Sequence, residues 1–226
     1  MGCERLKLIE ERIAKACERA GRKREEVLLL GASKSVPAER IREFYNCGLR
    51  VFGENRVQEF LKKYEELKDL PLDWHFIGRL QSNKVKYILR KVSLIHSLDR
   101  ESLLEELEKR ALALDIVQDV LIEVNLGHEE SKGGVEPEKL KAFFERCLGA
   151  KAVRVLGLMC IPPYFEDPQK ARPYFARLRE LKEELEREFG VELPHLSMGM
   201  SHDFEVAIEE GATIVRIGTA LFGARS

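Results

Sequence analysis

The segment VLLLGASKSVP, residues 27–37, contains the pattern that decides the fold. Its first six residues are apolar or small, which predicts a buried strand. Polar residues that include Lys34 follow directly, and Pro37 then marks a helix start, because proline is accommodated in the first helical turn. A strand, a polar turn and a helix in this order form one βα unit of an α/β protein.

The same order of elements recurs along the chain. Amphipathic stretches with apolar residues at steps of three and four separate the strands and predict covering helices. About eight βα units favour a closed (β/α)8 TIM barrel over an open doubly wound sheet. The expected strands are 27–32, 50–52, 74–77, 94–96, 120–124, 153–159, 193–196 and 213–217.

The chain is expected to form one domain over residues 1–226, because no Pro- or Ser-rich linker divides it. Before the first strand, Leu6, Ile9, Ile13 and Cys17 recur at helical spacing between charged residues. This pattern predicts an extra amphipathic helix and not a signal peptide. The longest predicted loop, 127–137, is rich in Gly and charge, and we expect a mobile excursion there.

Composition narrows the class of function. Lys and Arg number 38 against 39 Asp and Glu, so bulk charge gives no support for nucleic-acid binding. No apolar run has the length of a membrane span. The five cysteines form no C-x-x-C pair and the five histidines have no H-E-x-x-H spacing, so we expect no disulfide framework and no metal site. A reducing cytoplasm fits these features best.

Unusual polar residues are predicted at the carboxyl ends of the strands, where barrel enzymes build their sites. Lys34 follows the first strand and Asn55 the second, and the segment 197–201 follows the seventh. Arg216 and Gly218 end the eighth strand. Closure of the barrel makes the first and last strands neighbours, so Lys34 is expected beside Gly218.

Lys34 lies at the mouth of a buried strand. Desolvation there disfavours the ammonium form and lowers the pKa, as a Schiff-base amine requires. The alternative is a lysine that extends to solvent or forms a salt bridge.

Two segments predict a phosphate site. In SMGMSHDF (197–204), Gly199 permits a sharp turn, and Ser201 or Asp203 is placed to cap the next helix. In RIGTALFG (216–223), Gly218 permits close backbone approach and Thr219 adds a hydroxyl at a helix start. Phosphate sites in barrels frequently form after strands seven and eight. The segment 197–204 alone is equally consistent with an ordinary capped helix.

Three further residues are assigned to the core or left open. His96 is expected to line the barrel, and His75 is either a site group or a packing residue. Cys160 is expected to be a small core residue and not a nucleophile.

Six motifs together resemble one known family. They are ASKSVP (32–37), FGENRVQE (52–59), WHFIGRLQSNK (74–84), GLMCI (157–161), LSMGMSHDFEVAI (196–208) and VRIGTALFG (215–223). In this order they resemble the pyridoxal phosphate homeostasis proteins, the YggS/PROSC family, over essentially the whole chain. The resemblance implies an alanine-racemase-like barrel that binds pyridoxal 5'-phosphate (PLP).

The resemblance also implies roles for individual residues. Lys34 matches the family's Schiff-base lysine, and Arg216 matches the arginine that faces the pyridine nitrogen. Ser201, Gly218 and Thr219 match the phosphate-binding positions, and Asn55 matches a position near the cofactor.

Arg216 bears on catalysis, because a guanidinium only donates hydrogen bonds. It would keep the ring nitrogen unprotonated, which makes PLP a poor electron sink. Racemisation also needs an acid or base on each face of the substrate, and Lys34 serves one. The sequence continues three residues beyond Gly223, so we expect no second domain to supply the other.

The first interpretation is therefore a non-enzymatic protein that holds PLP on Lys34 and buffers or delivers it. PLP-dependent apoenzymes are the expected recipients, and the protein is expected to be a monomer or a weak dimer. The alternative is a PLP-dependent amino-acid racemase. A third interpretation is a cofactor-independent barrel enzyme that acts on a phosphorylated metabolite.

Overall fold

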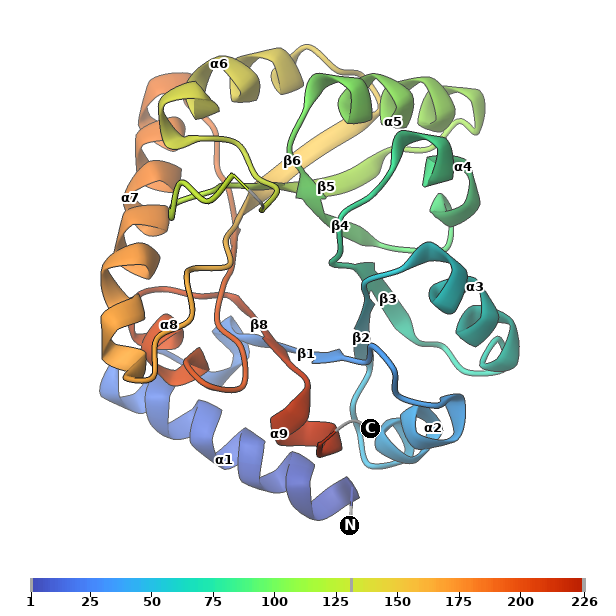
Figure 1. Cartoon of the computed structure of the whole chain (residues 1–226), viewed down its shortest axis with the longest axis vertical. Helices are drawn as coiled ribbons and strands as arrows, with labels where there is room; N and C mark the ends of the chain where they lie inside the picture. The colour runs from blue at the N-terminus through green and yellow to red at the C-terminus, as the bar shows by residue number, and fades with distance from the viewer. Residues whose placement is uncertain (1, 131, 225–226) are drawn as a thin grey trace.

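The computed structural model describes residues 2–130 and 132–224 and shows a closed barrel of eight parallel strands (Figure 1). Each strand pairs with the next, and β1 pairs with β8 to close the ring. Every predicted strand and the predicted barrel are confirmed. The strands are β1 (Leu28–Ala32), β2 (Val51–Glu54), β3 (Asp73–Phe76), β4 (Leu94–Leu98), β5 (Gln118–Glu123), β6 (Val153–Met159), β7 (His195–Ser197) and β8 (Ile214–Ile217).

Helices surround the barrel as an outer layer (Figure 1). Short 3-10 turns lie at Arg24–Glu26, Ser82–Lys84 and Pro168–Ala171. The α-helices that follow the strands are α2 (Ala38–Asn46), α3 (Val57–Glu66), α4 (Val85–Ile88), α5 (Glu101–Ala113), α6 (Pro137–Leu148), α7 (Arg172–Phe189), α8 (Phe204–Glu209) and α9 (Thr219–Phe222).

The extra N-terminal helix is also confirmed. It is α1 (Gly2–Arg19), and it packs against α8 and α9 (Figure 1). Leu6, Ile9, Ile13 and Cys17 are all buried on one face, as the spacing predicted.

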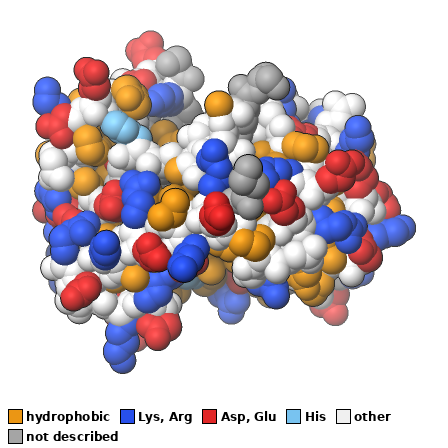
Figure 2. All heavy atoms as spheres, turned by 90° about the horizontal axis from the view of Figure 1, so that it is seen from below, with side chains coloured by type: hydrophobic (Ala, Val, Ile, Leu, Met, Phe, Trp, Pro, Cys, Tyr) orange, Lys and Arg blue, Asp and Glu red, His pale blue; other side chains and the backbone are white. Residues whose placement is uncertain are grey.

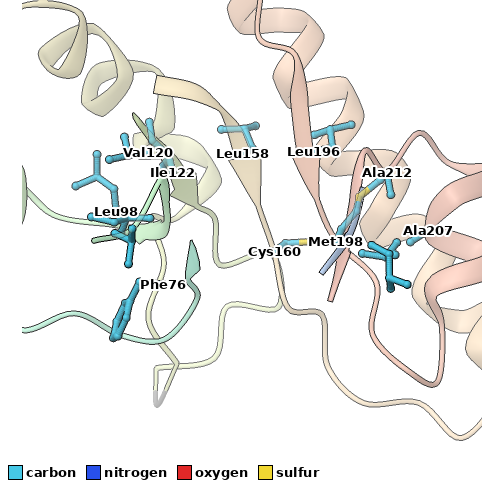
Figure 3. Close-up of a cluster of buried hydrophobic side chains, with 14 of the residues drawn as sticks. Phe76, Leu98, Val120, Ile122, Leu158, Cys160, Leu196, Met198, Ala207 and Ala212 are labelled. Atoms are coloured by element: carbon cyan, nitrogen blue, oxygen red, sulfur yellow. The ribbon is translucent and has the colours of Figure 1, made fainter. Parts of the chain in front are cut away.

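The largest core lies between the outer face of the strands and the helices. Figure 3 shows part of this layer, where side chains such as Ile122, Leu158 and Leu196 line up along neighbouring strands. A second apolar cluster fills the barrel itself and includes Leu30 and Met159. The barrel interior also buries polar side chains, among them His75, His96, Ser197 and Arg216.

One cysteine prediction was wrong. Cys3 and Cys47 form a disulfide with a Cα–Cα distance of 5.1 Å. The two residues are 44 positions apart, and only the packing of α1 beside the end of α2 brings them together. The spacing of cysteines in the sequence cannot predict a disulfide between two residues so far apart in the chain. Cys17, Cys147 and Cys160 are free and buried.

The predicted long loop after β5 is tied to the barrel at its ends. Val124 bridges to Val135, and the Gly134 N–H donates to Asp99 Oδ2 at 3.0 Å. Asn125 Nδ2 donates to the Glu129 carbonyl at 2.7 Å. The mobility of this segment stays a prediction, and residue 131 within it lies outside the described residues.

The surface carries charges of both signs. On the face in Figure 2, basic and acidic side chains are interspersed, as expected from the formal net charge of −1. Within residues 2–130 and 132–224, no helix has the length and apolar character needed to cross a bilayer. The same residues contain no group of three or more side chains suited to hold a metal ion.

Candidate functional site

The predicted site residues gather at the carboxyl ends of adjacent strands. Lys34 lies in the turn after β1 and Asn55 follows β2, while Arg216 lies in β8. The register pairs Leu30 with Arg216. Closure of the barrel therefore brings the Lys34 turn to the same part of the mouth as the segment after β8, as the sequence predicted.

Lys34 itself is exposed in a tight turn. The expectation that burial desolvates its amine was wrong, because β1 ends at Ala32 and the turn extends beyond the strand into solvent. Ser35, the next residue, has a φ of +63°. A serine in this left-handed region is strained, so contacts of the turn with neighbouring elements must hold it in place.

Four residues form those contacts, and we call Ser33, Glu54, Glu59 and Lys63 the outer cluster. The Lys63 ammonium, on α3, donates to the Ser33 carbonyl at 2.7 Å and to Glu54 Oε2 at 2.9 Å. It also donates to Glu59 Oε2 at 2.5 Å, and this oxygen accepts from the Ser35 backbone N–H at 2.7 Å. The Ser33 hydroxyl donates to Glu54 Oε2. The outer cluster therefore binds the turn on both sides of Lys34.

The two carboxylates of the outer cluster have opposite pKa shifts. Burial raises the pKa of Glu54, and the nearby Lys63 only partly offsets that effect. Burial also acts to raise the pKa of Glu59, but hydrogen bonds from Lys63 and the Ser35 N–H outweigh it and lower the pKa. Among the described residues, Glu54 Oε1 is buried without a hydrogen-bond partner.

Arg216 is fixed inside the barrel mouth and is 3% exposed. Its Nη1 donates to Ser197 Oγ at 2.5 Å and its Nη2 donates to the Cys160 carbonyl at 3.0 Å. Burial lowers its pKa, although the nearby Cys160, Glu123 and Asp203 side chains oppose that shift. A guanidinium starts from so high a pKa that it stays a donor.

The segment after β7 adopts the predicted sharp turn, with Gly199 at a φ of +101°. A Cβ at this position would lie 2.7 Å from Ala207 Cβ, so a larger residue would clash. Asp203 is the N-cap residue of α8, as one of the two predicted alternatives, but neither its side chain nor that of Ser201 makes a hydrogen bond that caps this helix. Ser201 Oγ accepts from the Ala220 N–H of α9 at 3.1 Å, and Asp203 Oδ1 closes the preceding turn on the Met200 N–H at 2.8 Å.

These groups present hydrogen-bond donors and an amine at one part of the mouth. The Ser201 hydroxyl accepts from α9, so its own hydrogen is available to an anion. Thr219 begins α9 on the exposed surface, and Gly218 precedes it. Donors next to a lysine amine fit a ligand that carries both a phosphate and an aldehyde.

Other predicted residues are placed as follows. Cys160 is buried, and burial raises the pKa of its thiol to about 12, so the prediction of a core residue is confirmed. His96 lines the barrel as predicted, and His75 hydrogen-bonds to it. Asn55 borders a groove of about 940 Å³ whose wall also includes Arg56, Lys62, Arg79 and Lys84.

Sequence reasoning missed two acidic residues at the ends of strands. Glu54 is fully buried at the end of β2. Glu123 ends β5, and burial, together with the nearby Asp99 carboxylate, raises its pKa to about 7. Both glutamates could have been found from the sequence, because each ends an apolar strand. The same pattern, a charged residue at the end of an apolar strand, predicted Lys34 as a site residue.

Comparison with known proteins identifies the family and supports the fold. The family described as alanine racemase, N-terminal domain, matches residues 6–226. A pyridoxal phosphate homeostasis protein from Aquifex aeolicus is 72% identical over 223 residues, which cover 99% of this chain and 98% of that protein. A protein of the same name from Pseudomonas aeruginosa is 46% identical, over 98% of this chain and 95% of its own length.

A solved structure is similar over nearly the whole chain. It is PipY of Synechococcus elongatus PCC7942 with PLP bound, which is 39% identical with a TM-score of 0.85. The match covers 95% of this chain and 100% of that one. The related proteins are thus named for homeostasis, and a structure of one of them contains PLP.

Proposed function

The chain belongs to the pyridoxal phosphate homeostasis protein family, and from this premise we propose that it binds PLP as a Schiff base on Lys34 and buffers or delivers the cofactor inside the cell. The observation that carries this proposal is the pairing of β1, which leads to the Lys34 turn, with the Arg216 strand β8, whose following helix is hydrogen-bonded to Ser201. PLP supplies an aldehyde that a lysine amine captures as an imine.

Each site residue has a proposed task. Lys34 provides the amine, and its exposed turn leaves the amine accessible from solvent. Ser201, Gly218 and Thr219 bind the phosphate, and Asn55 borders the cofactor. Arg216 donates toward the ring nitrogen, and because it cannot give up its proton, the nitrogen stays unprotonated.

The proposed position of Arg216 favours a protein that holds PLP over an enzyme that uses PLP for catalysis. A donor-only arginine weakens the electron-sink character on which most PLP chemistry depends. We therefore propose that the protein is not a racemase, and that PLP-dependent apoenzymes receive the cofactor. Racemisation of alanine or serine by the purified protein, abolished in Lys34→Ala, would instead establish an enzyme.

The decisive experiment is the absorbance spectrum of Lys34→Ala with added PLP. Wild-type protein should give an imine band that borohydride removes, with mass added at Lys34. Lys34→Ala should lose the band and keep its circular dichroism, since the residue is exposed. Lys109→Ala, which changes an exposed lysine on α5 outside the Asn55 groove, is the matched control. An imine band that persists in Lys34→Ala would overturn the assignment.

The phosphate contacts are tested by combining Ser201→Ala with Thr219→Val. Each hydrogen bond to a charged group contributes about 1–3 kcal/mol, so PLP affinity should fall clearly. Ser201 also accepts from α9, so thermal unfolding must be followed in parallel. Unchanged PLP affinity in a folded double variant would contradict this phosphate site.

Delivery is tested by mixing the PLP-loaded protein with a PLP-dependent apoenzyme in the presence of an excess trap for free PLP. The apoenzyme should gain activity faster than PLP alone can escape to the trap. Equal rates would show that release to solvent precedes uptake and that no direct transfer occurs.

A further inference from the structure

A line of hydrogen bonds crosses the barrel interior from Arg216 through Ser197 and His96 to His75, and Asp73 lies beyond His75. We call Asp73, His75, His96, Ser197 and Arg216 the interior chain. Arg216 Nη1 lies 2.5 Å from Ser197 Oγ, and this oxygen lies 2.9 Å from His96 Nδ1. His96 Nε2 lies 2.9 Å from His75 Nδ1. His75 Nε2 lies 3.6 Å from Asp73 Oδ2 at the start of β3.

Most of this chain is removed from water. Ser197 and His96 are fully buried, and His75 is 3% exposed. Burial, together with the nearby His75 and Arg216, holds the pKa of His96 well below its usual range. His96 is therefore a neutral imidazole, with one nitrogen that donates and one that accepts.

The two ends of the chain fix the direction of every hydrogen bond. Arg216 only donates, so Ser197 Oγ accepts from it. The Ser197 hydrogen must then point to His96 Nδ1, which leaves the His96 proton on Nε2. From there it is donated to His75 Nδ1.

The other end agrees with this direction. His75 accepts at Nδ1, so its own proton lies on Nε2 and faces the Asp73 carboxylate, which only accepts. Burial acts to raise the pKa of Asp73, but the nearby His75 and the hydrogen bond from the Ser93 hydroxyl outweigh it and lower the pKa, so Asp73 is ionised. A permanent donor at one end and a permanent acceptor at the other thus impose the same tautomer on both histidines.

We propose that Ser197, His96 and His75 are positioning residues that hold the Arg216 guanidinium in one orientation. One N–H of Arg216 is bound by Ser197 and one by the Cys160 carbonyl. The guanidinium plane is thereby fixed, and its remaining N–H groups are left for a ligand at the mouth. The role toward PLP rests on the proposed function; the fixed direction of the chain does not.

The first test needs no cofactor. Long-range ¹H–¹⁵N correlation spectra of the histidine-labelled protein should show both His75 and His96 protonated on Nε2 alone. In Ser197→Ala the Nδ1 resonance of His96 should shift, because its donor is gone. Ser97→Ala is the matched control, since Ser97 is buried on the same strand as His96 and its hydroxyl has no partner among the described residues. A proton on His96 Nδ1 in the wild type would overturn the proposed direction.

The second test measures the effect on PLP. Ser197→Ala should weaken PLP binding by about tenfold and shift the absorbance maximum of the bound cofactor, because a hydrogen bond to a charged group is lost. Ser97→Ala should change neither. His96→Asn, whose side chain retains an acceptor near the Nδ1 position, should preserve the absorbance maximum, and His96→Leu should not.

The outcomes separate the two proposals. Equal effects of Ser197→Ala and Ser97→Ala on the maximum would show that the chain does not position Arg216. A wild-type protein that binds no PLP would end the proposed function, while the tautomer result would still decide the direction of the chain.

Discussion

The interior chain and the outer cluster are two buried polar networks that end at the same site and differ in how their charges balance. The interior chain has a cation at one end, a carboxylate at the other and imidazoles between them. The outer cluster sets one ammonium, Lys63, against two carboxylates, Glu54 and Glu59. In the interior chain the buried members from Arg216 to His75 are each hydrogen-bonded to the next, whereas the outer cluster leaves one oxygen of Glu54 unpartnered among the described residues.

The difference in charge balance corresponds to the residue that each network positions, which is Arg216 for the interior chain and Lys34 for the outer cluster. Arg216 is buried and fixed, and the proposed function needs it to donate in one direction. Lys34 is exposed on a turn, and the proposed function needs its amine to form and release an imine. A network with excess negative charge and one cation depends strongly on that cation. We therefore expect the outer cluster to be the easier one to disrupt.

The largest effect is expected from Lys63→Met. The substitution removes the only ammonium of the outer cluster and leaves the Glu54 carboxylate buried beside Glu59. Breaking a buried pair at one partner costs about 3–5 kcal/mol. The free energy of unfolding, from urea denaturation, should fall by this amount. Lys62→Met, at the exposed neighbour, should change it by less than about 0.5 kcal/mol.

Restoring the balance sharpens this prediction. Adding Glu54→Gln to Lys63→Met removes the uncompensated charge, so the double variant should recover part of the lost stability. If the double variant is no more stable than Lys63→Met, the cost arises from lost packing of the lysine stem and not from charge.

The next effect is expected at the Cys3–Cys47 disulfide. Cys3–Cys47 joins α1 to the end of α2, the helix that begins after the Lys34 turn. Removing a disulfide that closes a loop of this length costs about 2–4 kcal/mol. Replacing both cysteines by serine should lower the unfolding free energy accordingly. Added reductant should destabilise the wild type and leave the double variant unchanged; equal sensitivity of both would exclude this bond.

A smaller effect, dependent on pH, is expected at Glu123, which lies near Arg216 at the mouth. Its pKa of about 7 in the folded protein exceeds the ordinary value of 4.5. The folded state therefore retains a proton that the unfolded state has lost, and this stabilisation is present below pH 4.5 and lost as the pH rises through about 7.

Glu123→Gln should remove this dependence. Between pH 4.5 and 8 the wild type should lose about 3 kcal/mol relative to the variant. Thermal unfolding of both proteins across this range measures the difference. Parallel pH profiles for the two proteins would show that Glu123 titrates normally.

The two networks also show what the sequence predicts well. Periodicity predicted all eight strands, because a buried strand needs a continuous apolar run whatever its neighbours are. The position of Lys34, Arg216 and Ser201 at the mouth followed from strand order and closure alone. These are properties of single segments or of the barrel as a whole.

The contacts inside each network did not follow from the sequence, because they join segments far apart in the chain. Ser197 and His96 are separated by 101 positions, and the Cys3–Cys47 pair by 44. The exposure of Lys34 depends on where β1 stops, and strand ends are poorly defined by composition. Pairwise chemistry between strands therefore required the structure.

The smallest effect is expected from Ser35→Gly, which tests whether the outer cluster holds the Lys34 turn against strain. Ser35 has a φ of +63°, and glycine adopts this region without a Cβ penalty. The N–H that donates to Glu59 Oε2 is kept. The relieved strain of about 1–2 kcal/mol exceeds the added unfolded-state entropy of about 0.5–1 kcal/mol, so the variant should be more stable by roughly 0.5 kcal/mol.

Ser35→Ala, which keeps the Cβ, should not be stabilised. A urea midpoint that rises for Gly but not for Ala, at unchanged slope, would show that the network holding Lys34 restrains a strained turn; a midpoint that falls for Gly would show that the turn is relaxed and that the cluster stabilises it by charge alone.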